Sequence, residues 1–196
     1  MREPLPLATI QGAVLEFLRG RDDVVVFGAQ AVNAYVAETR MTQDIDLLSP
    51  RAAELAPELQ GYLAGRFHIA VRVREIGEGR GYRLYQIRKP KNRHLVDVRW
   101  VDTLPAAQRV AQVLVISPVE LIAQKVVALQ RRRGQPKSGT DWRDLAMLLL
   151  TFPKLKADPG PVGERLCATG AGAQVLAVWR EIVAQEITPG DEDEEF

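Results

Sequence analysis

Residues 24–48 read VVVFGAQAVNAYVAETRMTQDIDLL, and this stretch decides the fold. The run 24–27 is wholly apolar, which is typical of a buried strand. Gly28 ends that strand, and residues 29–38 have the apolar spacing of a helix packed on one side. The alternating segment 44–48 indicates a second strand. The stretch therefore predicts a strand, a turn, a helix and another strand in direct succession.

Elements of both kinds are expected around this stretch. Three further strands are predicted over residues 67–76, 82–88 and 94–101. Helices are predicted over residues 7–19 and within residues 162–187. Three more are predicted with a residue that caps their first turn: one from Ser49 towards Leu63, one from the capping box at Ser117 to about Arg132, and one over residues 141–151 with Asp141 or Asp144 as the cap. After Pro105 we expect helices alone. The layout indicates an α+β fold.

The composition excludes several classes of protein. The 196 residues are 46% hydrophobic and 26% charged, which argues against a disordered or collagen-like chain. No run approaches the ~18 apolar residues of a membrane span, and the first residues lack the pattern of a signal peptide. Cys167 stands alone, so a disulfide framework and a cysteine metal cluster are excluded. We expect a cytoplasmic location.

The net charge of +1 conceals an uneven distribution. The tail 191–196 carries five acids and is expected to be disordered. Residues 66–99 hold ten Lys and Arg against three acids, and residues 125–143 hold six against one. Arg72 and Arg74 alternate with valines, so one face of their strand is wet or ligand-facing. Such patches suit nucleotides or RNA, although a solvated surface explains them equally well.

Asp44 and Asp46 are the first candidates for chemistry. Residues two apart on a strand project to one face, so we expect both carboxylates on the side opposite Ile45. Adjacent carboxylates repel unless a cation lies between them, and hard oxygen ligands select Mg²⁺ or Mn²⁺. Asp97, on the strand predicted over 94–101, is expected to join them. Taken alone, an Asp-x-Asp pair is also typical of an exposed strand end.

Gly28-Ala29 is the second chemical signal. A glycine where a strand meets a helix lets backbone N–H groups and the helix N-terminus face a phosphate. A phosphate cradle beside a carboxylate metal site is what phosphoryl or nucleotidyl transfer requires.

The spacing of residues 28–46, Gly-Ala, ten residues, then Arg-x-Thr-x-Asp-x-Asp, resembles the first motif of the nucleotidyltransferase (DNA polymerase β-like) superfamily. Within it, the pattern is most similar to the AbiEii-type toxins of bacterial toxin–antitoxin pairs. That family has Gly-Ser at the start of the motif. Ala29 departs from it and loses one phosphate hydrogen bond, worth about 0.5–1.5 kcal/mol. The resemblance covers roughly residues 24–150.

The resemblance also implies the residues of the site. Lys125 matches a later motif lysine, Asp141 or Asp144 matches a motif aspartate, and Asp97 corresponds to the third carboxylate. The implied catalytic residues are Asp44, Asp46, Asp97, Lys125 and Asp141. The implied metal ligands are Asp44, Asp46 and Asp97. The implied NTP-binding residues are Gly28, Ala29, Arg40, Thr42 and Lys125.

What the resemblance implies for function is a two-metal nucleotidyltransferase. Residues 1–103 would form the nucleotidyltransferase domain, with a polymerase β-like mixed sheet flanked by helices, and residues 104–190 a helical domain, with the active site between them. Two Mg²⁺ (or Mn²⁺) would be bound by Asp44 and Asp46, and Asp97 would help to deprotonate the acceptor. The substrate would be an NTP and the acceptor RNA or tRNA, and the protein would be the toxin of a pair with a cognate antitoxin.

Two other functions remain open at this point. One is a catalytically silent nucleotidyltransferase fold that acts as a binding partner in an operon-encoded complex, and Ala29 is its support. The other is a two-metal nuclease, which has no need of the phosphate turn at Gly28.

Structural roles compete with the chemical ones for several residues. Lys125 lies at the edge of an apolar stripe, where a lysine extends its ammonium group to water. Arg40 either binds phosphate or pairs with Glu38, and strand propensity alone would explain Thr42. Residues 131–137, which include three successive arginines, are either a contact for an RNA acceptor or a solvated helix end. His68 and His94 are interpreted as structural, and Trp100, Trp142 and Trp179 are expected in the core.

Overall fold

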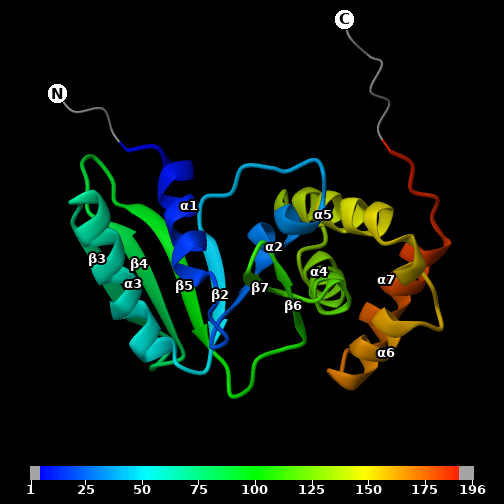
Figure 1. Ribbon diagram of the computed structural model, residues 1–196. Helices are drawn as coiled ribbons and strands as arrows, with labels where there is room; N and C mark the ends of the chain where they lie inside the picture. Colours follow the sequence, from blue (N-terminus) through cyan, green and yellow to red (C-terminus); the bar gives the residue numbers. More distant parts are fainter. Residues whose placement is uncertain (1–4, 190–196) are drawn as a thin grey trace, which may run out of the picture. The chain divides into compact units, whose positions relative to one another are not determined.

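The computed structural model describes residues 5–189, which form two compact units. Unit 1 comprises residues up to 34 together with 40–117, and unit 2 comprises residues 35–39 and those from 118 onward. The acidic tail 191–196 lies outside the described residues. Figure 1 traces the elements of both units along the chain.

Unit 1 contains a seven-stranded sheet in the order β3-β4-β5-β2-β1-β7-β6. The strands are β1 (Val25–Phe27), β2 (Ile45–Ser49), β3 (Val71–Ile76), β4 (Gly81–Gln86), β5 (Arg93–Trp100), β6 (Ala107–Val110) and β7 (Val113–Ile116). The helices are α1 (Leu7–Leu18), α2 (Gly28–Tyr35), whose last residue belongs to unit 2, and α3 (Ala52–Phe67). The predicted succession of strand, turn, helix and strand over residues 24–48 is confirmed.

The sheet is mixed, as the family resemblance implied. β2 runs parallel to β5 and β1 runs parallel to β7, whereas the other neighbouring pairs are antiparallel. The register places Asp46 of β2 directly beside Asp97 of β5. Because neighbouring residues in register share a face, the pairing alone brings two of the predicted site carboxylates together.

One face of the sheet is apolar and is covered by helix α3. Val73, Leu84, Val96 and Ile45 are neighbours in register on β3, β4, β5 and β2, and the last three are fully buried. Helix α3 packs against all four of these strands, and α1 packs against α3 (Figure 1). The other face of the same four strands, called the outer face below, carries the charged residues of the site.

Three local expectations are wrong. Residues 107–116 form β6 and β7 instead of continuing as helix, and Ser117 and Pro118 then mark the division between the two units. Ser49 ends β2, and its hydroxyl donates to the carbonyl of Asp23 and accepts from the N–H of Arg51, so it does not cap a helix. Trp100 is 48% exposed at the end of β5.

Unit 2 is helical. It contains α4 (Pro118–Arg131), α5 (Lys137–Thr151), the short 3₁₀ segment Pro153–Leu155, α6 (Pro161–Ala168) and α7 (Ala173–Ala184). Helix α4 packs against α5, α6 and α7, and Trp179 is buried as expected. Among residues 5–189 there is no helix with the length and apolar character needed to cross a membrane.

Candidate active site

Gly28 is required by the backbone where β1 meets α2. Its φ is +70°, a left-handed conformation that side chains other than glycine's disfavour. A Cβ at this position would lie 2.4 Å from Oδ2 of Asp46. The close approach therefore fixes the first turn of α2 against one of the carboxylates that the sequence assigned to the site.

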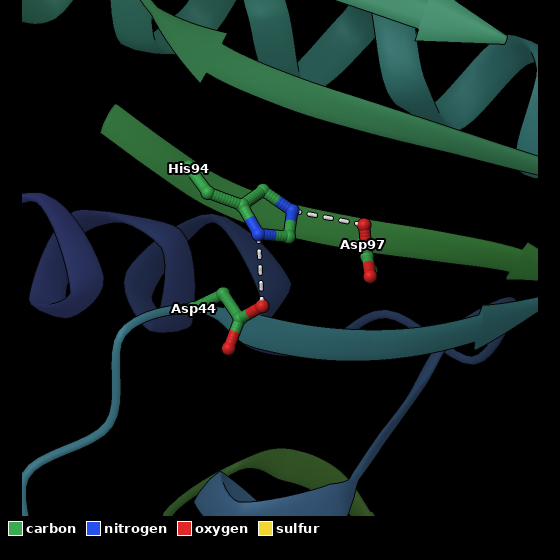
Figure 2. A group of neighbouring side chains, drawn as sticks. All are labelled: Asp44, His94 and Asp97. Carbon is green, nitrogen blue, oxygen red and sulfur yellow. Dashed lines mark hydrogen bonds and ion pairs between the residues drawn. The ribbon is translucent and has the colours of Figure 1, made fainter. Parts of the chain in front are cut away.

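The carboxylates of Asp44 and Asp97 lie on either side of the His94 ring. Nδ1 of His94 lies 3.0 Å from Oδ2 of Asp44, and Nε2 lies 2.9 Å from Oδ1 of Asp97. Figure 2 shows one ring nitrogen directed at each carboxylate. These hydrogen bonds, the one to Asp44 first, raise the pKa of His94 to about 10. At neutral pH the ring is an imidazolium that donates to both acids.

A β-bulge places His94 in this position. Leu84 pairs with Val96, whereas the next residue, Tyr85, pairs with His94, so Leu95 is the extra residue of β5. Strict alternation would point residues 94 and 97 to opposite faces, and the inserted residue brings them to the same one. The interpretation of His94 as a purely structural residue misses this contact. Its sequence signal was the pair of adjacent apolar residues, Leu95-Val96, which breaks the alternation of the strand.

Two arginines complete the polar surface around the carboxylates. Nε of Arg83 lies 2.9 Å from Oδ1 of Asp97, and Nη2 of Arg99 lies 3.5 Å from Oδ1 of Asp46. Burial raises the pKa of Asp46, and the neighbouring charges of Asp44 and Asp97 add to this against the opposing effect of Arg99. The site therefore brings three acids together. His94, Arg83 and Arg99 supply the balancing positive charge.

These residues fit a divalent cation through their oxygens. Asp44, His94 and Asp97 each offer a donor atom, and the three atoms lie within 4.8 Å of one another. Asp46 is next to Asp97 on the same face. Carboxylate oxygens suit Mg²⁺ or Mn²⁺, whereas an imidazolium that donates both N–H groups has no lone pair for a metal. The carboxylates are thus the natural ligands, and His94 occupies the region that their negative charge surrounds.

Thr42 and Arg40 hold the loop that leads to these carboxylates. The Thr42 hydroxyl accepts from Nε2 of Gln11 and donates to Oε1 of Gln30, and the residue lies outside any strand, so strand propensity does not explain it. The backbone of Arg40 exchanges two hydrogen bonds with the Asn33 side chain. These contacts join the loop to α1 and α2.

Within unit 2, Lys125 and Asp144 form a buried pair. Nζ of Lys125 lies 2.6 Å from Oδ2 of Asp144, which is fully buried, and 3.9 Å from Oδ1 of Asp141. Nη1 of Arg132 contacts both oxygens of Asp141, at 3.0 and 2.7 Å. Lys125 is itself buried.

Several of the competing structural roles can now be judged. Lys125 does not extend to water. Helix α5 begins at Lys137, so Asp141 and Asp144 lie inside the helix and neither is its cap. Glu38 pairs with Arg143, at 3.7 Å, and the phosphate-binding role of Arg40 stays a prediction. Arg132 is engaged by Asp141, so only two of the three successive arginines stay exposed.

Comparison with known proteins assigns the chain to a family. Residues 15–158 match the family described as nucleotidyl transferase AbiEii toxin, type IV TA system. The chain belongs to the AbiEii family. No curated protein matches the sequence. The AbiEii assignment agrees with the motif at residues 28–46, because the matched region contains it.

Solved structures support the fold of this AbiEii member. A Megavirus polyadenylate synthase has a TM-score of 0.61 at 14% identity, with 78% of this chain and 32% of that one covered. JHP933 from Helicobacter pylori has a TM-score of 0.56 at 13% identity over 90% and 87% of the two chains. A nucleotidyltransferase-like protein from Paracoccidioides brasiliensis has a TM-score of 0.52 at 17% identity over 93% and 94%. The AbiEii chain thus spans about a third of the viral enzyme's length, and these likenesses show a nucleotidyltransferase fold.

Proposed function

We propose that this AbiEii protein transfers a nucleoside monophosphate from an NTP to an acceptor hydroxyl, with RNA or tRNA as the acceptor, and that it acts as the toxin of a toxin–antitoxin pair. The observation that carries the proposal is the group of three carboxylates, of which Asp46 lies against the glycine turn. Family membership supports transfer, and the basic residues around the site support a polyanionic acceptor.

The proposed reaction is a substitution at the α-phosphorus of the NTP. The acceptor oxygen forms a bond to this phosphorus, the bond to the pyrophosphate oxygen breaks, and the hydroxyl proton passes to Asp97. Asp97 suits this role because it is 5% exposed and is oriented by Arg83 and His94. Backbone N–H groups after Gly28 would bind the triphosphate.

Asp44, Asp46 and Asp97 would hold two Mg²⁺ or Mn²⁺ ions, which when bound neutralise the charge of the triphosphate and of the leaving pyrophosphate. His94 would then give up its place between Asp44 and Asp97. The roles predicted for Lys125 and Asp141, in binding phosphate and in catalysis, remain predictions. Their buried ion pairs are consistent with side chains held in fixed orientations.

A second candidate is a silent nucleotidyltransferase fold that binds a partner in an operon-encoded complex. One observation favours it, namely the missing hydroxyl at Ala29. Both candidates require the same fold and differ in whether the carboxylates accept a metal.

The proposal is tested by incubating the protein with Mg²⁺, total cellular RNA and each of the four NTPs labelled at the α-phosphate in turn. We expect label in RNA with at least one NTP, and none when EDTA replaces Mg²⁺. Label confined to the protein would indicate a different acceptor. No label with any NTP, together with unimpaired folding, would favour the silent candidate.

A further inference from the structure

Two rows of side chains cross the outer face of the sheet from the carboxylates to the edge strand β3. In the first row, Asp46 of β2 is beside Asp97 of β5, Asp97 is opposite Arg83 of β4, and Arg83 is opposite Arg74 of β3. The row is acidic at β2 and basic at β3. The face therefore carries a charge gradient that ends at the proposed site of transfer.

The second row repeats the first one step along the strands. Asp44 precedes β2 and contacts His94 of β5, His94 is opposite Tyr85 of β4, and Tyr85 is opposite Arg72 of β3. The rings of Tyr85 and His94 lie 5.2 Å apart, centre to centre. Tyr85 thus lies between the exposed Arg72 and the carboxylates. This arrangement suits a single strand of nucleic acid, with a base stacked on the Tyr85 ring and a neighbouring phosphate at Arg72.

The basic end of these rows has no internal explanation. Arg72 and Arg74 are exposed, and neither pairs with a carboxylate within residues 5–189. Arg74 lies directly opposite Arg83, and like charges in that arrangement destabilise a sheet. Arg83 directs one nitrogen at Asp97 and is still 43% exposed. An anion bound over this surface would remove the repulsion.

We propose that the outer face of β3 and β4, with Arg72, Arg74, Arg83 and Tyr85, binds the sugar–phosphate backbone of the RNA acceptor. The inference rests on the proposed function, because it takes the acceptor to be RNA. With strands about 4.8 Å apart, Arg74 is about 10 Å across the sheet from Asp97. An RNA end whose hydroxyl lies at Asp97 extends its next phosphates over this surface.

The position of β3 in the sheet argues against the NTP as the ligand of this surface. The glycine turn follows β1, and β3 is four strands away from β1 in the order of the sheet. Four strand spacings amount to about 19 Å, which exceeds the reach of a triphosphate held at Gly28. The acceptor is the remaining polyanion of the reaction.

The test compares two double variants that remove the same charge. Arg72→Gln/Arg74→Gln alters the surface, and Arg131→Gln/Arg133→Gln removes two exposed arginines at the end of α4. Affinity is measured by fluorescence anisotropy with a short, end-labelled single-stranded RNA of mixed sequence, over a range of KCl concentrations. Thermal melting confirms that each variant is folded.

Each phosphate contact on a single strand contributes about 0.7 to the slope of log K against log salt, or about fivefold in affinity at 0.1 M salt. We therefore expect Arg72→Gln/Arg74→Gln, called the β3 variant, to bind RNA about 25-fold more weakly than the parent. The magnitude of its salt slope should be smaller by about 1.4. Arg131→Gln/Arg133→Gln is called the α4 variant. The α4 variant tests the rival RNA contact left open at residues 131–137, and under this inference it should bind nearly as the parent does. Equal losses in the two variants, or a larger loss in the α4 variant, would overturn the inference.

A transfer assay separates this inference from the proposed function. In the β3 variant, the KM for RNA should rise while kcat at saturating RNA is kept. If the parent transfers label to RNA and the β3 variant binds RNA normally, the surface is wrong and the function stands. If the parent binds RNA through this surface and transfers nothing, the function is wrong and the surface stands. A parent that does not bind RNA overturns the inference.

Discussion

Replacing Gly28 by alanine tests the geometry of the site with a change of one methyl group. Gly20→Ala is the matched control, because Gly20 has φ +75° and a Cβ there would meet nothing within 4 Å. Both variants pay the cost of a left-handed alanine, about 1–2 kcal/mol. Gly28→Ala must also relieve a contact of 2.4 Å with Asp46, which is typical of overpacking that costs about 1–3 kcal/mol more.

The measurements are thermal melting and transfer activity. The cost of the backbone conformation alone should lower Tm by about 2–8 °C in a chain of this size, and Gly28→Ala should lower it further. Only Gly28→Ala should lose activity, by about 100-fold, because Asp46 has to move by a distance of the order of 1 Å. In an Asp46→Ala background, the stability cost of Gly28→Ala should shrink towards that of Gly20→Ala.

The reasoning is refuted if Gly28→Ala and Gly20→Ala lose the same stability and both retain transfer. It is also refuted if the cost of Gly28→Ala is unchanged when Asp46 is absent. In either case the contact between the glycine turn and the carboxylate does not determine the site.

Three further outcomes follow from the ion pairs. Lys125→Met removes the ammonium partner of the fully buried Asp144 and should cost about 3–5 kcal/mol in urea unfolding, whereas Lys125→Met/Asp144→Leu should recover much of it; equal losses would contradict a stabilising buried pair. Asp141→Ala, which removes the buried partner of Arg132, should melt lower and also lose kcat in the folded fraction, while Asp144→Ala should melt lower and keep kcat in the folded fraction; the reverse pattern of kcat would exchange their roles. Arg21 holds the pKa of Asp23 below the ordinary value of 3.8, so this ion pair stabilises the fold above pH 3.8 and is lost as the pH falls through the lowered pKa. The difference in Tm between the parent and Asp23→Asn should therefore shrink below pH 3.8. A difference that persisted in acid would show that the ion pair is not its cause.

Much of unit 1 could be predicted because its signals are local. The apolar run 24–27, the glycine after it and the alternation in residues 44–48 each specify their structure without help from distant residues. The in-register approach of Asp46 and Asp97 depends on which strands pair. It was nonetheless expected, because the family resemblance named both residues.

Other features were missed, most of them because they depend on distant contacts. Residues 113–116, VLVI, form an apolar run like that of residues 24–27 and carried a local strand signal that the expectation of helices overlooked. Residues 107–110 are mixed in polarity, and they form β6 by pairing with β7, which itself pairs with β1. The bulge at Leu95 changes which side chains share a face, which hid His94. Helix α5 starts four residues before Asp141, so the buried partner Lys125 explains this acid better than a cap does.

The most direct test of the central claim follows the fate of the NTP phosphates in the parent and in Asp46→Asn and Asp97→Asn. NTP labelled at the α-phosphate or at the γ-phosphate is incubated with RNA and Mg²⁺, and the label is followed into RNA and pyrophosphate. Nucleotidyl transfer predicts α-label in RNA and γ-label in pyrophosphate for the parent, and neither for the two folded variants. Label from the γ-phosphate in RNA, or undiminished α-label transfer by both variants, would contradict the account.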